Sequence, residues 1–121
     1  QTWDAPSDIR MKDVEANSPL GLDFVKALQP IEYHLKPADQ WPPEWGVPPD
    51  AKVNTEAHTL GLAAQNVEAA LKASGNPVFH GWTLRDNGQQ LLGESAFVYP
   101  LINAVKELAA EVAALQKHTK H

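Results

Sequence analysis

The chain has 121 residues, of which 43% are hydrophobic and none is cysteine; this allows one domain with a modest core and excludes disulfides, thiolate metal sites and cysteine catalysis. The formal net charge is −5, so no basic surplus exists to neutralise phosphates, and we expect no nucleic-acid partner. No apolar run approaches the roughly 18 residues of a membrane span, and no signal pattern begins the chain, so we expect no membrane partner.

The first 17 residues are polar and show no clear period. Because Gln1 is not an initiator methionine, we expect the sequence to be a segment of a longer protein. The run Ser7-Asp8-Ile9-Arg10-Met11-Lys12 places a hydroxyl, a carboxylate and two cations close together. A serine with a lysine in reach can be a nucleophile with its own base. The simpler interpretation of the run is a polar turn capped by its serine or aspartate.

Residues 18–36 predict a helix followed by a strand. Ser18 is a candidate N-cap with Pro19 in the first turn. The apolar residues at helical spacing are Leu20, Phe24, Ala27 and Leu28, and Pro30 ends the run. Strict alternation then predicts a half-buried strand over 31–36. Its inward residues would be Ile31, Tyr33 and Leu35, with His34 facing solvent.

Residues 37–56 form a loop rich in proline and tryptophan. Proline excludes a helix or a central strand here, and loops of this length are usually functional or poorly ordered. Trp41 and Trp45 have two interpretations. They form a sugar-stacking or partner-binding surface, or they pack on the prolines of the loop and anchor it.

The middle of the chain predicts one helix between short strands. A strand over 58–62 precedes a helix over 63–73, which Ser74-Gly75-Asn76-Pro77 ends. The core face of this helix would contain Val67, Ala70 and Leu71. Strands over 78–84 and 89–92 flank Asp86-Asn87-Gly88, which favours a hairpin with a type I′ turn at Asn-Gly.

A helix over 96–118 carries the strongest periodic signal. An a/d seam alternates valine and leucine: Val98, Leu101, Val105, Leu108, Val112 and Leu115. The helix either starts at Pro100 or is kinked there. Valine at a with leucine at d favours two strands, but the apolar flanks Ile102, Ala104 and Ala109 suit burial on two sides, in a trimer or against the domain's own core. The alternative is an amphipathic helix of a monomer.

No cofactor or metal is expected. None of the five histidines is paired with a second strong ligand at a zinc spacing: His34, His58, His80, His118 and His121. The glycines form no phosphate loop, and no Gly-x-Ser-x-Gly elbow is present. Ser7 with Lys12 is therefore the one candidate for catalysis.

Four motifs in order resemble a known family, the C-terminal intramolecular chaperone and self-cleaving peptidase domain of endosialidase-type phage tail spikes and fibres. The opening hexamer 7–12 is similar to Ser-Asp-x-Arg-hydrophobic-Lys, and residues 27–33 resemble its Leu-x-Pro-x-x-Tyr/Phe entry to a strand. Residues 60–67 resemble Gly-hydrophobic-x-Ala-Gln-x-Val, and residues 101–108 resemble its closing Leu-x-x-Ala-hydrophobic-Lys-Glu-Leu helix. The resemblance covers nearly all of residues 7–117.

The resemblance implies an α+β fold of short helices and β-hairpins with a long C-terminal helix, assembled as a parallel homotrimer around a coiled-coil-like axis. Its partners would be two further copies and the parent fibre chain in cis. Residues 1–6 would end the parent fibre, and 7–121 would form the chaperone domain. Such a domain aligns three chains, in the virion tail or in its assembly intermediate in the host cytoplasm. The alternative function is a receptor- or glycan-binding fibre tip that is retained uncleaved.

The resemblance also implies a single self-cleavage. Ser7 matches the nucleophile and Lys12 its base, and the bond cut is Pro6–Ser7. Arg10 would help to lower the pKa of the lysine, whereas Asp8 would oppose this if it lay close, or would orient the loop instead. The ring of Pro6 restricts approach to the bond, and residues N-terminal to Ser7 are still present in this chain. Both observations favour little or no cutting.

Overall fold

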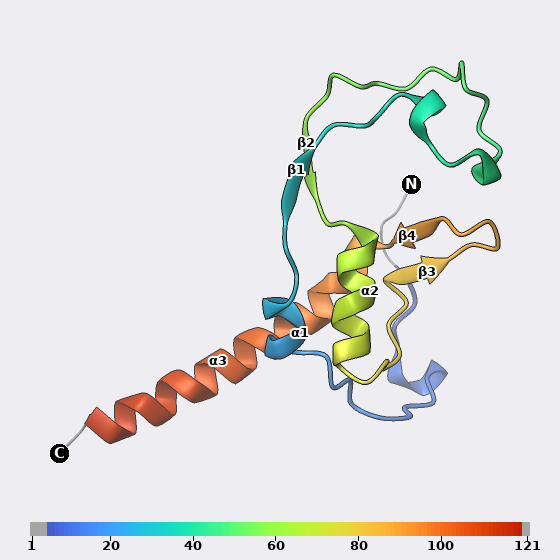
Figure 1. Ribbon diagram of the computed structural model, residues 1–121. Helices are drawn as coiled ribbons and strands as arrows, with labels where there is room; N and C mark the ends of the chain where they lie inside the picture. Colours follow the sequence, from blue (N-terminus) through green and yellow to red (C-terminus); the bar gives the residue numbers. More distant parts are fainter. Residues whose placement is uncertain (1–4, 120–121) are drawn as a thin grey trace.

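This computed structural model describes residues 5–119. They fold into helices and two small antiparallel sheets that are joined by loops (Figure 1). The helices are α1 (Leu22–Lys26), α2 (Ala64–Ala73) and α3 (Val98–Thr119). One sheet pairs β1 (Ile31–Tyr33) with β2 (Thr59–Gly61), and the other pairs β3 (Trp82–Leu84) with β4 (Gln90–Leu92). The predicted α+β class with a long C-terminal helix is confirmed. Residues 1–4 of the predicted linker and His121 lie outside the described residues.

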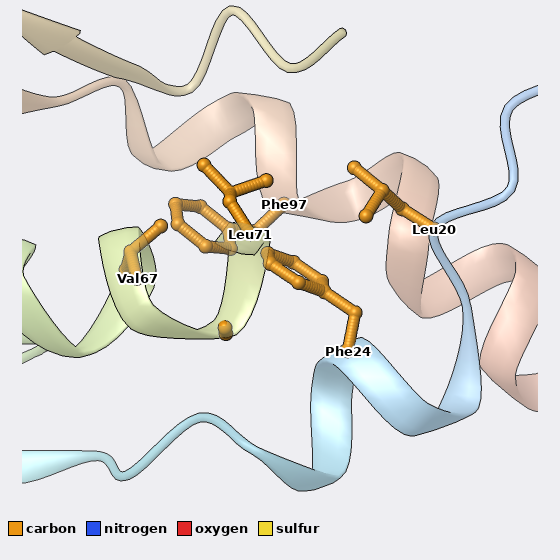
Figure 2. Packing of buried hydrophobic residues seen from close by; sticks show 6 residues of the cluster. Leu20, Phe24, Val67, Leu71 and Phe97 are labelled. Carbon is orange, nitrogen blue, oxygen red and sulfur yellow. The ribbon is translucent and has the colours of Figure 1, made fainter. Parts of the chain in front are cut away.

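The hydrophobic core forms where α1, α2 and the start of α3 meet (Figure 2). Phe24 of α1 is 2% exposed, and its ring lies edge-on to Phe79 with centroids 5.5 Å apart. Phe97, just before α3, packs against the same Phe79 ring at 5.1 Å. The helical core face predicted for α2 is confirmed, since its three residues are buried: Val67, Ala70 and Leu71. Left-handed Gly75 and Asn76 end α2 where predicted.

Helix α1 begins later than its sequence predicts. Ser18 does not cap it, because the Ser18 hydroxyl accepts a hydrogen bond from the Leu20 amide at 3.3 Å in the turn that precedes the helix. Gly21 is the N-cap instead. A glycine has no side chain with which to cap, and the Leu22 amide donates to the Glu107 carboxylate of α3 at 2.6 Å. A contact from the other end of the chain thus sets the start of this helix.

Strand β1 is shorter and more exposed than predicted. It covers Ile31–Tyr33 rather than 31–36, and the predicted inward residues are all exposed, with Leu35 beyond the strand. The sheet of β1 and β2 leaves the body towards the loop (Figure 1), and no helix of residues 5–119 packs across it. The alternation correctly indicated a strand, but in a single chain neither face of this sheet is covered.

The hairpin of β3 and β4 forms with a different turn. Gly88 is left-handed with φ 87°, whereas Asn87 has a negative φ, which excludes the predicted type I′ turn. The Gly88 amide donates to the Arg85 carbonyl at 3.0 Å, and the Arg85 amide donates to the Gln89 carbonyl at 2.9 Å. This is the three-residue loop in which a type I turn precedes a left-handed glycine. Both strands are also shorter than predicted.

Helix α3 starts at Val98 after a 3-10 turn, not at residue 96. Pro100 lies in its first turn, where the missing amide hydrogen breaks no helical bond, so the helix is not broken there. Its inner face docks on α1: Ala104 is buried, and the Asn103 amide group donates to the Leu20 carbonyl at 2.8 Å. Ala104 thus packs against the chain's own core. The C-terminal part of α3 projects away from the body (Figure 1).

Candidate functional site

Ser7 and Lys12 lie in direct contact. The Lys12 ammonium donates to the Ser7 hydroxyl oxygen at 2.7 Å. A short 3-10 helix, Ile9–Met11, lies between them and folds the chain back so that the two side chains meet. The sequence therefore brings a hydroxyl and an amine within hydrogen-bond reach through local structure alone, the arrangement that a serine nucleophile with a lysine base would need.

Asp8 and Arg10 hold this turn. The Asp8 carboxylate caps the turn by accepting from the Arg10 amide at 2.9 Å, and its second oxygen pairs with the Arg10 guanidinium at 2.7 Å. These hydrogen bonds, the side-chain ones above all, hold the pKa of Asp8 below its ordinary value and raise the pKa of Arg10. Asp8 thus caps the turn and pairs with Arg10. The roles expected of these two residues towards Lys12 stay predictions.

The segment around this pair is open to solvent. Every residue from 5 to 19 is exposed, and the short helix of the turn contacts no other helix or strand of residues 5–119. Ile9, Met11 and Val14 show large apolar side chains to water in the same segment. A serine peptidase also needs donors for an oxyanion and exclusion of water. A single chain supplies the pair but not that enclosure.

A second candidate site is the outer face of α3. All six seam residues are exposed in the single chain, from 46% at Leu108 to 64% at Val105 and Leu115. Ile102 on the flank is 50% exposed. An apolar stripe along a projecting helix is the kind of surface that marks a protein–protein contact. The inner face of the helix is already used by α1, so the stripe faces away from the core.

The tryptophans of the loop at 37–56 contact one another. Their ring centroids are 6.3 Å apart, and the Trp41 indole donates to the Lys36 carbonyl at 3.0 Å. Both rings are half-buried; Trp41 follows the one-turn 3-10 helix Ala38–Gln40, and Trp45 is the last residue of the next one, Pro43–Trp45. The loop has no longer helix and no strand, as predicted, and it projects from the body beyond β1 and β2 (Figure 1). These contacts favour the anchoring interpretation of the tryptophans.

Three polar residues that join the helices had no predicted role. The Asn66 side chain of α2 accepts from the Gln29 amide at 2.8 Å and donates to the Ala27 carbonyl at 3.0 Å. Asn103 and Glu107 join α3 to the segment that leads into α1. All three lie inside the recognised sequence motifs. The sequence did carry a signal for them: each is a polar residue in a helical motif that has an apolar face.

The sequence pattern of one family, described as chaperone of endosialidase, matches residues 7–76, more than half of the chain. The chain belongs to the chaperone of endosialidase family. The match begins at the serine of the Ser7–Lys12 pair, and it spans α1, β1, β2 and α2. It ends before β3, so it does not test the resemblance of the closing helix. No curated protein matches the chain.

Residues 5–119 contain neither a cluster of metal ligands nor a helix that could span a membrane. Among residues 5–119, no three histidine, aspartate or glutamate side chains gather as metal ligands would. None of the helices there combines the length and apolarity that crossing a bilayer requires.

Proposed function

We propose that residues 7–121 are a trimerising intramolecular chaperone that folds and assembles a phage tail fibre or tail spike. The observation that carries the proposal is the exposed apolar face of α3, together with membership of the family. That face is exposed in residues 5–119 and is covered by no other described part of the chain, and valine and leucine at a and d fit other copies of the same helix. The domain would act in cis on its parent fibre, in the virion tail or in its assembly intermediate in the host cytoplasm.

The proposed role has a physical basis in how fibres fold. Trimeric β-structures depend on contacts far apart in sequence or between chains, and such structures form slowly. A terminal unit that trimerises first raises the effective concentration of the three chains that must wind together.

Deletion of residues 7–121 from the parent fibre tests the chaperone role. We expect insoluble or unassembled protein, because the three fibre chains then have no domain that aligns them. Removing the domain by an engineered protease site after assembly should leave the fibre trimer intact. Soluble, detergent-resistant trimers of the truncated parent would contradict the proposal and favour a receptor- or glycan-binding tip.

Self-cleavage before Ser7 is a second proposed function, supported by the 2.7 Å contact between the Lys12 ammonium and the Ser7 hydroxyl. In its neutral form, Lys12 would take the hydroxyl proton as Ser7 Oγ attacks the Pro6 carbonyl carbon. The C–N bond of Pro6–Ser7 breaks, the Ser7 nitrogen leaves as an amine with a proton, and an ester links Pro6 to Ser7 Oγ. Water then hydrolyses the ester and frees a chain that starts at Ser7. Cleavage after assembly would make unfolding hard to reverse, which is kinetic stability.

The intact mass of the parent protein tests this chemistry. Ser7→Ala and Lys12→Ala should both abolish cutting and leave the trimer unchanged, since neither side chain contributes to the core. Pro6→Ala should restore or accelerate cutting, because the proline ring restricts approach to its carbonyl. If Pro6→Ala stays uncut in a well-folded trimer, the pair is structural, and the peptidase function is wrong for this chain.

A further inference from the structure

An apolar groove lies beside the N-terminal end of α3. Its volume is about 380 Å³, and its walls come from three parts of the chain. Its apolar lining includes Val25, Leu28, Leu60, Leu62, Phe97 and Leu101. Leu60 is 75% exposed on the β2 side of the groove. A large leucine this open to water, on the wall of an otherwise apolar groove, indicates that the groove is filled by something outside the single chain.

The heptad pattern of α3 gives the position of this groove relative to a neighbouring helix. With Val98 at a and Leu101 at d, Phe97 falls at g of the preceding heptad and Ile102 at e. In a parallel coiled coil, a g residue of one helix faces the e residue of the next heptad in the neighbouring helix. Phe97 of one chain therefore faces Ile102 of the next chain, and Phe97 forms part of the groove wall.

The two flanks of the α3 seam are unlike each other, as this arrangement requires. On the g flank, Phe97 and Ala104 are buried against the chain's own body. On the e flank, Ile102 is 50% exposed, and Tyr99, one turn earlier, is 61% exposed. One flank thus belongs to a groove already built by the domain, and the other presents free apolar side chains that fit such a groove.

We propose that the groove is a socket for Ile102 of a second copy of this chain. Each subunit of the trimer inserts Ile102 between Leu60 and Phe97 of its neighbour, so the domains interlock around the axis and not only through the seam. Glu94 is the one charged residue lining the socket. This inference rests on the proposed trimer and adds the contact that sets its register.

The socket also accounts for the shortness of the seam. Two and a half heptads of a/d contacts are marginal for an independent coiled coil. Burial of an isoleucine in each of three sockets adds apolar contact between the bodies of the domains, where the helices are already fixed by α1. Register is then set at the N-terminal end of α3, next to the part of the chain that leads back to the fibre.

Cysteine cross-linking tests the socket, and the chain contains no cysteine of its own. The double variant Leu60→Cys/Ile102→Cys changes two exposed side chains, so it should fold. Treated with a short bismaleimide, it should give covalent trimers on a denaturing gel. Leu60→Cys/Ala109→Cys is the matched control, because Ala109 occupies the same flank one heptad further on and should not reach Leu60. Light scattering of both reduced proteins should give a trimer.

The outcomes separate the socket from the trimer itself. Covalent trimers from the Ile102 pair alone support the socket. A trimer in light scattering with cross-links only inside single chains, or with equal cross-linking of the Ala109 control, overturns the socket and leaves the proposed trimer standing. A monomer in light scattering overturns both.

Discussion

The Asp8–Arg10 pair lies in the turn that joins Ser7 to Lys12. Two side-chain hydrogen bonds from Arg10, at 3.0 and 2.7 Å, act on an Asp8 carboxylate that is also bonded to the Arg10 amide. The pair is open to solvent, so its contribution is screened by water and salt. The pair orients the turn, and its measurable effect is the lowered pKa of Asp8.

Arg10→Gln should raise the pKa of Asp8 towards its ordinary value, because the first cause of the lowered pKa is the Arg10 side chain. A carboxylate whose pKa is lowered by folding stabilises the folded turn above the pKa of the unfolded chain, and this contribution is lost as pH falls through the lowered value. Titration of the Asp8 carboxyl carbon by NMR measures the shift. Lys12→Gln is the control, since Lys12 contacts Ser7 and not Asp8. Equal titration of the unmutated protein and Arg10→Gln would contradict the assignment.

At the scale of elements, Asn66 joins α2 to the end of α1. Its side chain makes two hydrogen bonds to backbone groups, at 2.8 and 3.0 Å, across 37 and 39 residues of sequence. Since α1 has five residues, it cannot be stable alone. Contacts from α2 and α3 hold it in place.

Asn66→Ala should lower the free energy of unfolding by about 1–3 kcal/mol, the sum of two lost hydrogen bonds. Urea unfolding at a fixed protein concentration measures the loss, because an assembled protein also gains stability from association. Gln65→Ala is the matched control, since Gln65 is the exposed neighbour on the same helix. Equal losses for the two variants would show that the Asn66 bonds add nothing.

The loop at 37–56 is joined to the body through β1 and β2. Its tryptophans contact each other and their own loop, so replacing Trp41 and Trp45 together with alanine should leave the trimer intact. We expect a small loss of stability, typical of changes outside the core. Thermal unfolding and light scattering check this. A midpoint many degrees lower would show that the loop clamps a neighbouring chain.

At the scale of the whole molecule, one side of α3 holds the domain together and the other side is available for assembly. Ala104, Asn103 and Glu107 bind the helix to the body. Leu108 is 46% exposed in one chain but lies at a d position of the seam. We expect other copies that cover the apolar stripe to stabilise the end of α3 beyond the body, because an isolated helix of this length is marginal in water.

Leu108→Asp should convert the trimer into monomers, because it would bury three carboxylates near one axis without partners. The core should survive, since the side chain is exposed in the single chain. Light scattering measures the assembly, and far-ultraviolet circular dichroism should show partial loss of helix. Ala110→Asp is the control, as Ala110 lies on the side away from the seam. A monomer for the unmutated domain would contradict the whole assembly proposal.

The sequence alone determined the features that depend on local spacing. The core face of α2, the apolar stripe of α3 and the position of the hairpin follow from residues a few places apart, whose geometry is fixed by the helix or the turn. Ser7 and Lys12 also meet through a local turn, so their contact was predictable. The family motif at residues 7–12 is the ground for proposing self-cleavage at that contact.

The tertiary structure decided what depends on contacts between distant segments. The start of α1 is set by Glu107, 85 residues away, and no local signal encodes that bond. Alternation in β1 indicated a strand but not whether a helix would cover it. The heptad marked both flanks of α3 as apolar, yet packing on α1 buried Ala104 and left Ile102 free. Burial belongs to the surface that two segments share, so one segment's pattern cannot determine it.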